Sequence, residues 1–397
     1  MNVFPVNVLP VNVLFISPGF PPPFVLFCEA LRAAGANVLG LGDIPAGALG
    51  DRLHRVLSDY AFVPSLADDD AVLRAVAGLV HRNGRIEHVD SLNEHWLDLE
   101  ATIRADFNVP GPRSVETTSW RSKTAMGERF TRAGLSPPIS QRVERPDDVR
   151  AFARTQGFPI LVKPDVGVGA AGVHDATNDA ALEMLLATVP VTGAVVQEFV
   201  TGRLVTFDGL ADRDGRLVSA SSATYVAGVM EFSRDRLDVE YHVRRIVPPE
   251  VRRVGEVILE AFDVRGRFFH IEMFELADGS VRPLEINMRP PGGFSVDLMN
   301  FAGDVDLYRA WADVLMGRCP ARFADEQRYA TAHVGRRPWH RYRRDGDEVA
   351  RALGPALVAS PWMAPMIAEV MGSPVFVVRH ESEEELARLV ALALERA

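Results

Sequence analysis

Residues 282–293 read RPLEINMRPPGG, a strand-like stretch that ends abruptly. Alternate side chains of a strand point to the same face. The polar side chains therefore share one surface: Glu285, Asn287 and Arg289. The apolar side chains are expected in a core on the other face: Leu284, Ile286 and Met288. Because the prolines and glycines at 290–293 stop the strand, the sequence predicts a polar cluster at a strand end, as in a binding or catalytic site.

The preceding stretch, RFFHIEMFEL at 267–276, is a second candidate strand, and the linker ADGS contains Asp-Gly at 278–279. Asp-Gly is a strong signal for a two-residue hairpin turn. Equal steps from that turn place Glu272 opposite Glu285 and His270 opposite Asn287. Directly opposed residues have Cβ atoms about 4.5–5.5 Å apart, and like charges there destabilise a sheet by up to about 1 kcal/mol. A positively charged group is therefore expected to offset the repulsion between the two carboxylates.

A divalent cation is the simplest compensation, because Mg²⁺ takes oxygen ligands and often shares them with substrate phosphates. The candidate ligands are two carboxylates and an amide: Glu272, Glu285 and Asn287. Arg289, next on the same face, suits a phosphate or carboxylate held against the metal. The alternative interpretation is a solvent-facing strand pair with acids placed by chance.

A glycine-rich run follows the candidate strand PILVKP, with glycines at 167, 169 and 172 in the spacing GxGxxG. A dinucleotide-binding fold needs a helix to begin within this motif, whereas helical character here starts near Asn178. We therefore expect a hairpin whose backbone N–H groups close over phosphates, with Lys163 at its entrance. The alternative is a glycine-rich surface turn beside a solvated lysine.

The length, net charge and cysteine content of the chain limit the kinds of fold and binding partner that are expected. A chain of 397 residues is too long for one hydrophobic core and suggests several subdomains. A formal charge of −10 argues against nucleic acid and acidic membrane surfaces. Cys28 and Cys319 are the two cysteines and lie far apart in the sequence, so neither a disulfide framework nor a zinc site is indicated and a reducing cytoplasm is expected. The apolar N-terminal stretch lacks a basic region and is interrupted by prolines, so we expect neither a targeting signal nor a membrane span.

Five features occur in a set order along the chain: Lys123, Lys163-Pro, the glycine run, Gln197-Glu198-Phe-Val-x-Gly, and Glu272 followed by Glu285-x-Asn287-x-Arg289. This order resembles the ATP-grasp superfamily over residues 113–317. The alternation of strand and helix before residue 113 is similar to the pre-ATP-grasp domain of those enzymes. The two-strand acidic signature with two upstream lysines is specific, whereas each element alone is not.

The resemblance implies an α/β fold in which a Rossmann-like parallel α/β domain precedes two ATP-grasp subdomains of α+β type and a small α+β extension. The implied boundaries are 1–112 for the pre-ATP-grasp domain, 113–200 for the lid subdomain, 201–320 for the metal-binding subdomain and 321–397 for the C-terminal extension.

The resemblance also implies roles for individual residues. The ATP phosphates would be bound by Lys123 and Lys163 beneath a lid that contains Gly167, Gly169 and Gly172. The adenine would be read by the hinge Gln197, Glu198, Phe199 and Val200. Two Mg²⁺ ions, or Mn²⁺ in their place, would be held by Glu272, Glu285 and Asn287. Arg289 would be a catalytic group that stabilises an acyl phosphate. Apart from the resemblance, His270 shares the face of Glu272 and is a second catalytic candidate, which touches phosphate or orients a ligand.

One position departs from the family pattern: Leu204 stands where family members usually carry an acid that holds the ribose. The segment PPGGFS after Arg289 is more similar to carboxylate-amine ligases than to biotin carboxylases. We therefore expect an ADP-forming ligase that joins a small carboxylate, such as an amino acid, to an amine. A carboxylase or carbamoyl-phosphate-type enzyme that uses bicarbonate and a catalytically silent ATP-binding regulator are the alternatives. A homodimer is compatible with each of these interpretations.

Overall fold

The computed structural model describes residues 10–167, 172–226, 237–361, 363 and 365–397. The chain forms two compact units, of which the first comprises Met1–Ser119 with Tyr308–Pro320 and the second comprises Trp120–Leu307 with Ala321–Ala397. This division is coarser than the four expected domains, whose boundaries stay a prediction. Among the described residues, no helix combines the length and the apolar character needed to cross a membrane.

The first unit is built on a parallel sheet with strand order β3-β2-β1-β4. All five residues of β1 are buried, as expected for a parallel strand with both faces covered. Trp311 of α12 packs edge-on against Phe15 and Phe27, and thereby fixes this late segment to the first strand and helix. The elements are β1 (Asn12–Ile16), α1 (Phe24–Ala33), β2 (Asn37–Gly42), η1 (Ala46–Ala48), α2 (Asp51–Val56), β3 (Asp59–Phe62), α3 (Asp69–Asn83), β4 (His88–Asp90), η2 (Glu94–Trp96), α4 (Leu97–Asp106), α5 (Ser114–Arg121, which ends beyond the unit boundary) and α12 (Leu307–Leu315).

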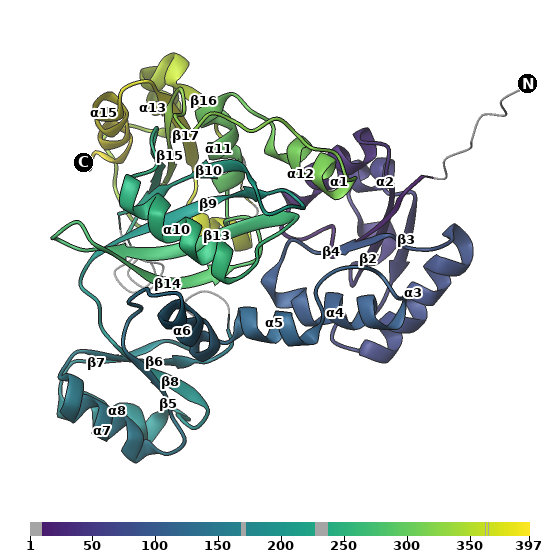
Figure 1. The fold of residues 1–397 in the computed structure, drawn as a ribbon. Helices are drawn as coiled ribbons and strands as arrows, with labels where there is room; N and C mark the ends of the chain where they lie inside the picture. Colours follow the sequence, from purple (N-terminus) through teal and green to yellow (C-terminus); the bar gives the residue numbers. More distant parts are fainter. Residues whose placement is uncertain (1–9, 168–171, 227–236, 362, 364) are drawn as a thin grey trace, which may run out of the picture. The chain divides into compact units, whose positions relative to one another are not determined.

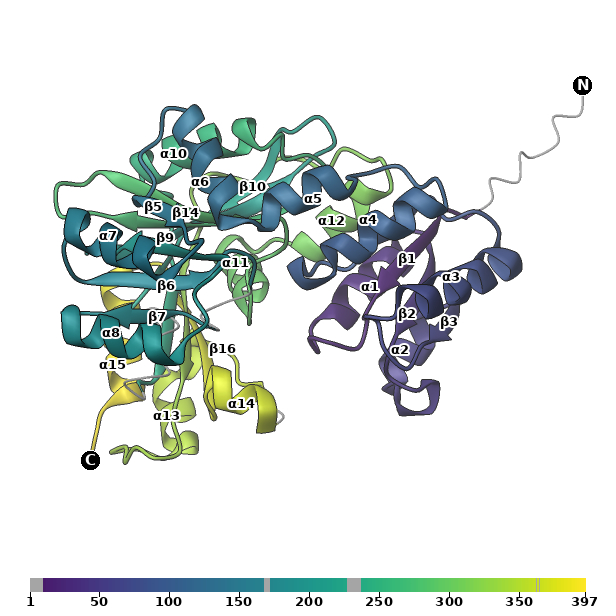
Figure 2. The ribbon, with the colours of Figure 1, turned by 90° about the horizontal axis from the view of Figure 1, so that it is seen from below.

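The second unit contains a small antiparallel sheet with strand order β5-β8-β6-β7. Helices α7 and α8 cover one face of it (Figure 2), and Val149, Phe152, Leu182 and Leu185 of these helices pack there against the sheet. The opposite face carries Lys163, because β6 alternates and Val162 points to the helices. The elements are α6 (Lys123–Arg132), β5 (Ser140–Arg142), α7 (Pro146–Gln156), β6 (Ile160–Pro164), β7 (His174–Ala176), α8 (Asp179–Thr188) and β8 (Ala194–Glu198).

The remainder of this unit is a nine-stranded sheet with strand order β14-β13-β9-β11-β12-β15-β17-β16, and β10 pairs with β9. Helix α10 lies across β9, β13 and β14 (Figure 1). A Cβ at Gly255 of α10 would approach the ring of Phe207 to 2.2 Å, so glycine permits this close packing. The elements are β9 (Arg203–Ala211), β10 (Leu217–Ser221), β11 (Ala223–Tyr225), β12 (Val239–Val243), α10 (Pro249–Ala261), β13 (Arg267–Glu275), β14 (Val281–Asn287), α11 (Ser295–Gly303), β15 (Ala330–Gly335), α13 (Gly346–Leu353), η3 (Gly354–Ala356), β16 (Leu357–Ala359), α14 (Pro365–Met371), β17 (Val375–His380) and α15 (Glu383–Leu394).

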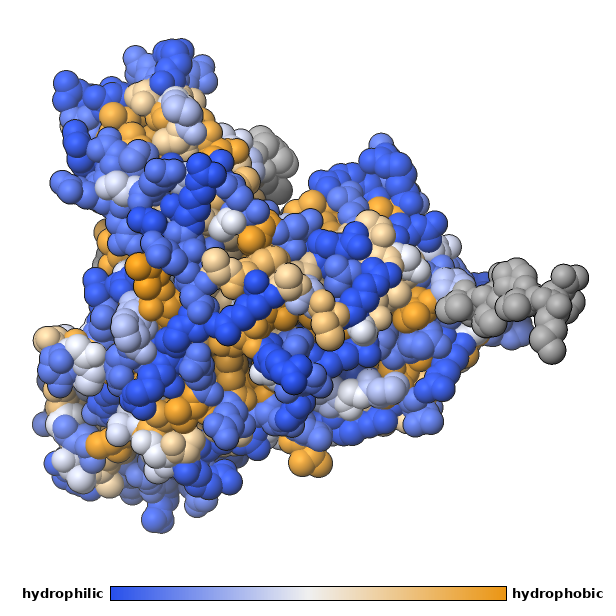
Figure 3. Space-filling model, turned by 45° about the horizontal axis from the view of Figure 1, so that its top comes forward, coloured by the Kyte–Doolittle hydropathy of each residue, from blue (hydrophilic) through white to orange (hydrophobic). Residues whose placement is uncertain are grey.

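The helices on this sheet determine which face the site uses. Helices α13 and α15 pack against Ala332 and Val378, whereas Leu298 of α11 packs on the opposite face with Tyr241 and Val377. Strand β9 pairs with β11, β11 pairs with β12, and β12 pairs with β15. Followed across these pairs, the apolar residues of β9 that contact α10 lie on the same face of the sheet as α15. The polar residues of β9, β13 and β14 therefore lie on the face that α11 shares. On the surface in Figure 3, hydrophobic residues interrupt a largely hydrophilic exterior.

Candidate active site

The hairpin β13–β14 has the predicted register at its polar residues: Glu272 pairs with Glu285, and His270 pairs with Asn287. The turn differs from the prediction. Leu276 N–H donates to the Ser280 carbonyl at 2.9 Å, and Gly279 has φ +81°, so the loop contains three residues instead of two. A bulge between Glu272 and Met273 restores the register.

The extra residue of this bulge is Leu284, because Met273 pairs with Pro283 and the next pair is Glu272 with Glu285. Leu284 is therefore half-buried, so the prediction that it enters the core is wrong. Ile286 and Met288 are buried, as predicted. Pro283 is tolerated in β14 because this strand is at the edge of the sheet. The outcome is that the two carboxylates face each other across neighbouring strands.

A third strand, β9, completes the polar surface. Thr206 pairs with Glu272, and Asp208 pairs with His270. Both β9 residues are buried, and the Thr206 hydroxyl donates to an Asp208 oxygen at 2.5 Å. The backbone N–H of Ala223 donates to the same hydroxyl oxygen at 3.0 Å. Asp208 is thus fixed within the same polar face as Glu272, and it was not among the predicted site residues.

His270 lies between two carboxylates. Its Nδ1 is 2.6 Å from Asp208 Oδ1, and its Nε2 is 3.2 Å from Glu272 Oε1. Burial alone would lower the pKa of His270, but the charges and hydrogen bonds of Asp208 and Glu272 outweigh it and raise the pKa to about 9. The imidazolium donates from both nitrogens, so this ring is arranged to orient Glu272.

The two predicted phosphate-binding lysines belong to different elements. Lys163, in β6, is buried, and burial lowers its pKa to about 8, although Glu285 and Glu272 oppose this shift. Lys123 begins α6, and its Nζ donates to the Gly167 carbonyl at 3.3 Å. The charge of Lys123 also lowers the pKa of Lys163. The structure therefore brings the two lysines and the two glutamates into one electrostatic environment.

Composition gives a further signal for these two side chains. The sequence contains 43 basic lysine and arginine residues, and Lys123 and Lys163 are its only lysines. Arginine cannot replace lysine where a compact ammonium group with an adjustable pKa is required. The two predicted phosphate-binding residues therefore differ chemically from every arginine of the chain.

The glycine run connects two antiparallel strands, β6 and β7, in which Val162 pairs with His174. The run is therefore a hairpin connection, as predicted, and not the strand-to-helix turn of a dinucleotide-binding fold. Asn178 caps α8 by accepting the Ala181 N–H, so the helix begins where the sequence predicted. Gly167 and Gly172 flank the loop, whereas Gly169 lies outside the described residues.

At the predicted hinge, the Glu198 carboxylate accepts the Ile139 N–H at 2.7 Å and is bonded to Arg282. Arg282, on β14, also donates to the carbonyls of Ser136 and Pro137 at 3.2 and 2.8 Å. Arg282 thus links β14 to the predicted hinge, a contact that the sequence did not predict.

Gln197 precedes Glu198 and offers a contact of a different kind. Its Oε1 is buried and has no hydrogen-bond partner among the described residues. An unpartnered buried acceptor costs about 1–3 kcal/mol unless a bound group satisfies it. An exocyclic amine would satisfy this acceptor. Phe199, the next hinge residue after Glu198, is exposed, whereas Leu204 is half-buried on the face of β9 that carries Thr206 and Asp208.

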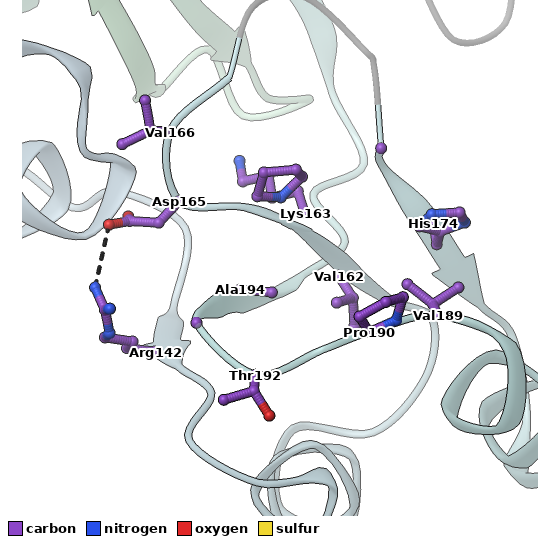
Figure 4. Close-up of a pocket in the computed structure, with 13 residues that line it drawn as sticks. Arg142, Val162, Lys163, Asp165, Val166, His174, Val189, Pro190, Thr192 and Ala194 are labelled. Carbon is purple, nitrogen blue, oxygen red and sulfur yellow. Dashed lines mark hydrogen bonds and ion pairs between the residues drawn. The ribbon is translucent and has the colours of Figure 1, made fainter.

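A cavity of about 590 Å³ lies at the end of the small sheet. Lys163, Asp165, Gly172 and His174 line it with residues of the loop before β8 (Figure 4). In Figure 4 the side chains of Lys163 and Asp165 diverge from the end of β6, and Asp165 points toward Arg142. The cavity therefore adjoins both the predicted phosphate lysine and the glycine hairpin.

Arg289 follows the hairpin, and its Nη1 donates to the Pro290 carbonyl at 2.9 Å. Burial opposes the ionisation of Glu272, but His270, Arg289 and Lys163 hold the pKa of this carboxyl below its usual value. The charges of Glu272 and Arg289 also reach Tyr225, whose pKa is raised mainly by burial. Arg289 thus lies near Glu272 at the end of the strand, beside the turn that leads into α11.

The donor set fits a divalent metal that shares its ligands with phosphate. No group of three or more His, Cys, Asp or Glu side chains that could enclose a metal occurs within the described part of the chain. The predicted set has two carboxylates and Asn287, whose Nδ2 is 3.3 Å from Glu285 Oε1. Mg²⁺ commonly takes one or two carboxylates and leaves its other positions to phosphates and water, so these residues are compatible with it.

Sequence reasoning missed Thr206, Asp208, Tyr225 and Arg282, which lie on strands other than the predicted hairpin or outside its acidic pattern. The alternation of Thr206 and Asp208 in LVTFDG was a usable signal for a polar strand face. Their position beside His270 depends on a pairing between residues 62 positions apart, which a single sequence does not give.

Comparison with known sequences gives relatives of low identity, and no family model matches the chain. The arginine-specific large chain of carbamoyl phosphate synthase from Lactiplantibacillus plantarum is 23% identical over 265 residues, 61% of this chain. This chain spans about a quarter of the length of that relative. The L-arginine-specific L-amino acid ligase of Bacillus subtilis is 19% identical over 275 residues, which cover 65% of this chain and 66% of the ligase.

Solved structures match the fold over almost the whole chain. The L-amino acid ligase from Bacillus licheniformis has a TM-score of 0.74 at 16% identity and covers 96% of both chains. The ADP complex of PurK, an N5-carboxyaminoimidazole ribonucleotide synthetase, has a TM-score of 0.73 at 14% identity over 98% of this chain and 97% of that one. The order of the two lysines, the glycine run and the paired glutamates is the pattern by which the sequence resembles the ATP-grasp superfamily. The chain therefore has the fold of the ATP-grasp ligases, which its motifs predict.

Proposed function

We propose that this protein is an ATP-dependent carboxylate-amine ligase that forms an amide or peptide bond through an acyl phosphate. The observation that carries the proposal is the pair Glu272 and Glu285, which face each other on neighbouring strands with Lys163 close enough to affect both. Two opposed carboxylates with an adjacent amide and a buried ammonium form a site for a metal and a phosphate. The fold and the L-amino acid ligases among its relatives support the same assignment.

In the first step, an oxygen of the substrate carboxylate attacks the γ-phosphorus of ATP, and the bond to the β-phosphate oxygen breaks to release ADP. Lys123 and Lys163 would hold the phosphates, and Glu272, Glu285 and Asn287 would hold Mg²⁺. Bound Mg²⁺ neutralises charge on the transferred group, which is the main requirement of phosphoryl transfer. His270 and Asp208 would keep Glu272 in its orientation.

In the second step, the amine nitrogen attacks the acyl carbon, phosphate leaves, and the nitrogen loses a proton. Arg289 would stabilise the oxygens that gain charge during this attack. The unpartnered Gln197 Oε1 would accept from the exocyclic amine of adenine. Leu204 provides no acceptor for the ribose hydroxyls, so we expect the nucleotide to be held mainly by its phosphates and base.

The substrate class can be tested directly. We expect that incubation with ATP, Mg²⁺ and pooled L-amino acids and small carboxylates releases phosphate and yields a condensed product, which mass spectrometry identifies as the sum of two substrates minus water. Omission of single components then identifies the carboxylate and the amine. ADP release without any condensed product from any pool would contradict the ligase assignment.

Bicarbonate is the alternative carboxylate, and it is favoured by the sequence similarity to a carbamoyl phosphate synthase large chain. In that case ATP hydrolysis should depend on bicarbonate and not on amino acids. A non-catalytic regulator would bind ATP and show neither dependence. The same assay therefore distinguishes the three candidates.

Three finer features belong to this proposal. Two Mg²⁺ ions are proposed because two carboxylates and one amide face a phosphate-binding region. A cytoplasmic location is supported by the unpaired state of Cys28 and Cys319. A homodimer is compatible with the chain and can be tested by sedimentation.

Replacement of either lysine by Met is expected to weaken ATP binding. Each change removes a charge-assisted contact, which is typically worth about 1.5–3 kcal/mol, or about 10- to 150-fold in Kd. Calorimetry with ATP and Mg²⁺ measures the effect for Lys123→Met and Lys163→Met. Arg150→Met is the matched control, since Arg150 belongs to α7 and pairs with Glu183 on the exposed surface. Unchanged ATP affinity in both lysine variants would contradict the phosphate role.

A further inference from the structure

Asp165, two residues after Lys163, is bonded to the start of α6, the helix that carries Lys123. Its Oδ2 accepts the Ser122 hydroxyl at 2.9 Å, and its Oδ1 accepts the Thr124 N–H at 2.8 Å. Its backbone carbonyl accepts the Lys123 N–H at 2.9 Å. One residue at the end of β6 therefore binds three consecutive residues around the second lysine.

These contacts are not needed to begin the helix. Ser122 is itself the N-cap of α6, and its Oγ accepts the Ala125 N–H at 3.1 Å. The bonds from Asp165 are additional, and they join α6 to the strand that carries Lys163. Arg142 Nη1 lies 3.4 Å from Asp165 Oδ2 (Figure 4), which further restricts the carboxylate.

The arrangement matters because two ammonium groups repel each other. Lys123 is near enough to Lys163 to disfavour its charged form, and like charges separate unless their backbones are constrained. Lys123 Nζ also donates to the Gly167 carbonyl, two residues beyond Asp165. The short segment from Lys163 to Gly167 thus holds both lysines at the entrance of the glycine hairpin.

We propose that Asp165 is a positioning residue that fixes Lys123 relative to Lys163 so that both can bind the phosphates of one nucleotide. This inference rests on the proposed function, in which the two lysines bind ATP. Asp165 acts through Lys123 and does not itself touch the nucleotide, because both of its carboxylate oxygens already accept hydrogen bonds from the protein.

A double-mutant cycle tests the coupling. We expect Asp165→Ala to raise the Kd for ATP by about tenfold, the lower end of the loss of one charge-assisted contact. Lys123→Met should raise it at least as much, and the double variant should bind no more weakly than Lys123→Met alone, since residues that act through one contact are non-additive. Asp165→Asn keeps an acceptor for the Thr124 N–H and should bind ATP with intermediate affinity.

Selective labelling provides a readout that general destabilisation would not reproduce. Because Lys123 and Lys163 are the only lysines, protein labelled with ¹³C at lysine Cε gives two side-chain signals. In Asp165→Ala the Lys123 signal should move toward that of a solvated lysine and lose most of its shift on ATP addition. The Lys163 signal should keep its own response to ATP.

Asp148→Ala is the matched control. Asp148 accepts the N–H groups of Glu144 and Arg145 at the start of α7, at 3.0 and 2.9 Å, in the same subdomain. Its loss should lower Tm and leave ATP affinity unchanged. Additive losses in the double variant, or wild-type ATP affinity in both Asp165 variants, would overturn the inference alone. Failure of the wild-type protein to bind ATP would overturn the proposed function as well.

Discussion

Replacement of Glu285 by Gln is expected to abolish amide formation and to leave the fold intact. Glu285 directly opposes Glu272 and lies within the electrostatic reach of Lys163. The change removes an anionic metal ligand, and the charge stabilisation supplied by a bound metal is worth several kcal/mol, so turnover should fall by about 10³-fold or more. It also relieves the repulsion between opposed carboxylates, so the free energy of unfolding should change by no more than about 1 kcal/mol.

The measurement is phosphate and product release at saturating Mg²⁺, with chemical denaturation as the stability check. Glu275→Gln is the matched control, because Glu275 is on β13, the strand paired with β14, but forms an ion pair with Arg203 away from the proposed metal face. It should retain nearly full turnover. If Glu285→Gln turns over at the wild-type rate, these carboxylates do not form a metal site.

The hairpin shows why the sequence predicted the register of the polar residues better than it predicted the turn. The Asp-Gly pair suggested a two-residue loop, but Gly279 takes the left-handed conformation as the last residue of a three-residue loop. That change alone would shift Glu272 out of register with Glu285. The bulge at Leu284 shifts it back. A requirement that polar residues share one face is strict, whereas the local chain can meet it with several combinations of loop and bulge.

Contacts between distant segments could not be predicted from the sequence. Asp208 reaches His270 through the pairing of β9 with β13, and Arg282 reaches Glu198 across 84 residues. Neither pair shares a helix face or a hairpin, so no periodicity connects them. The fold class was predictable because alternating strands and helices, the glycine run and the helix start at Asn178 are local signals.

The two lysines were predictable as site candidates, but their proximity was not. Their spacing of 40 residues indicates no contact, yet their isolation among arginines distinguishes them chemically. Asp165 explains how the chain brings them together, since it directly follows the strand of one and binds the helix start of the other. Composition therefore marked the pair, while only the structure shows what holds it.

Replacement of Arg289 by Ala is expected to lower the rate of amide formation far more than it weakens ATP binding. Arg289 lies where its charge affects Glu272 and Tyr225, directly beyond β14 and before the turn into α11. A fixed donor aimed at oxygens that gain charge in the transition state is worth about 3–4 kcal/mol, so kcat should fall by about 10²–10³-fold. The ATP Kd should change by less than about threefold, since the nucleotide phosphates are assigned to the lysines.

Arg289→Lys tests whether a positive charge at this position is sufficient for the wild-type kcat. Lysine keeps the positive charge but lacks the planar fork that binds two oxygens at once, so we expect only a partial recovery of kcat. Arg253→Ala on α10 is the control, because Arg253 pairs with Glu250 at the surface and should not affect the reaction. Single-turnover measurements separate the two chemical steps. If ATP affinity falls in parallel with kcat in Arg289→Ala, then Arg289 binds the nucleotide in the ground state, and transition-state stabilisation must come from other groups.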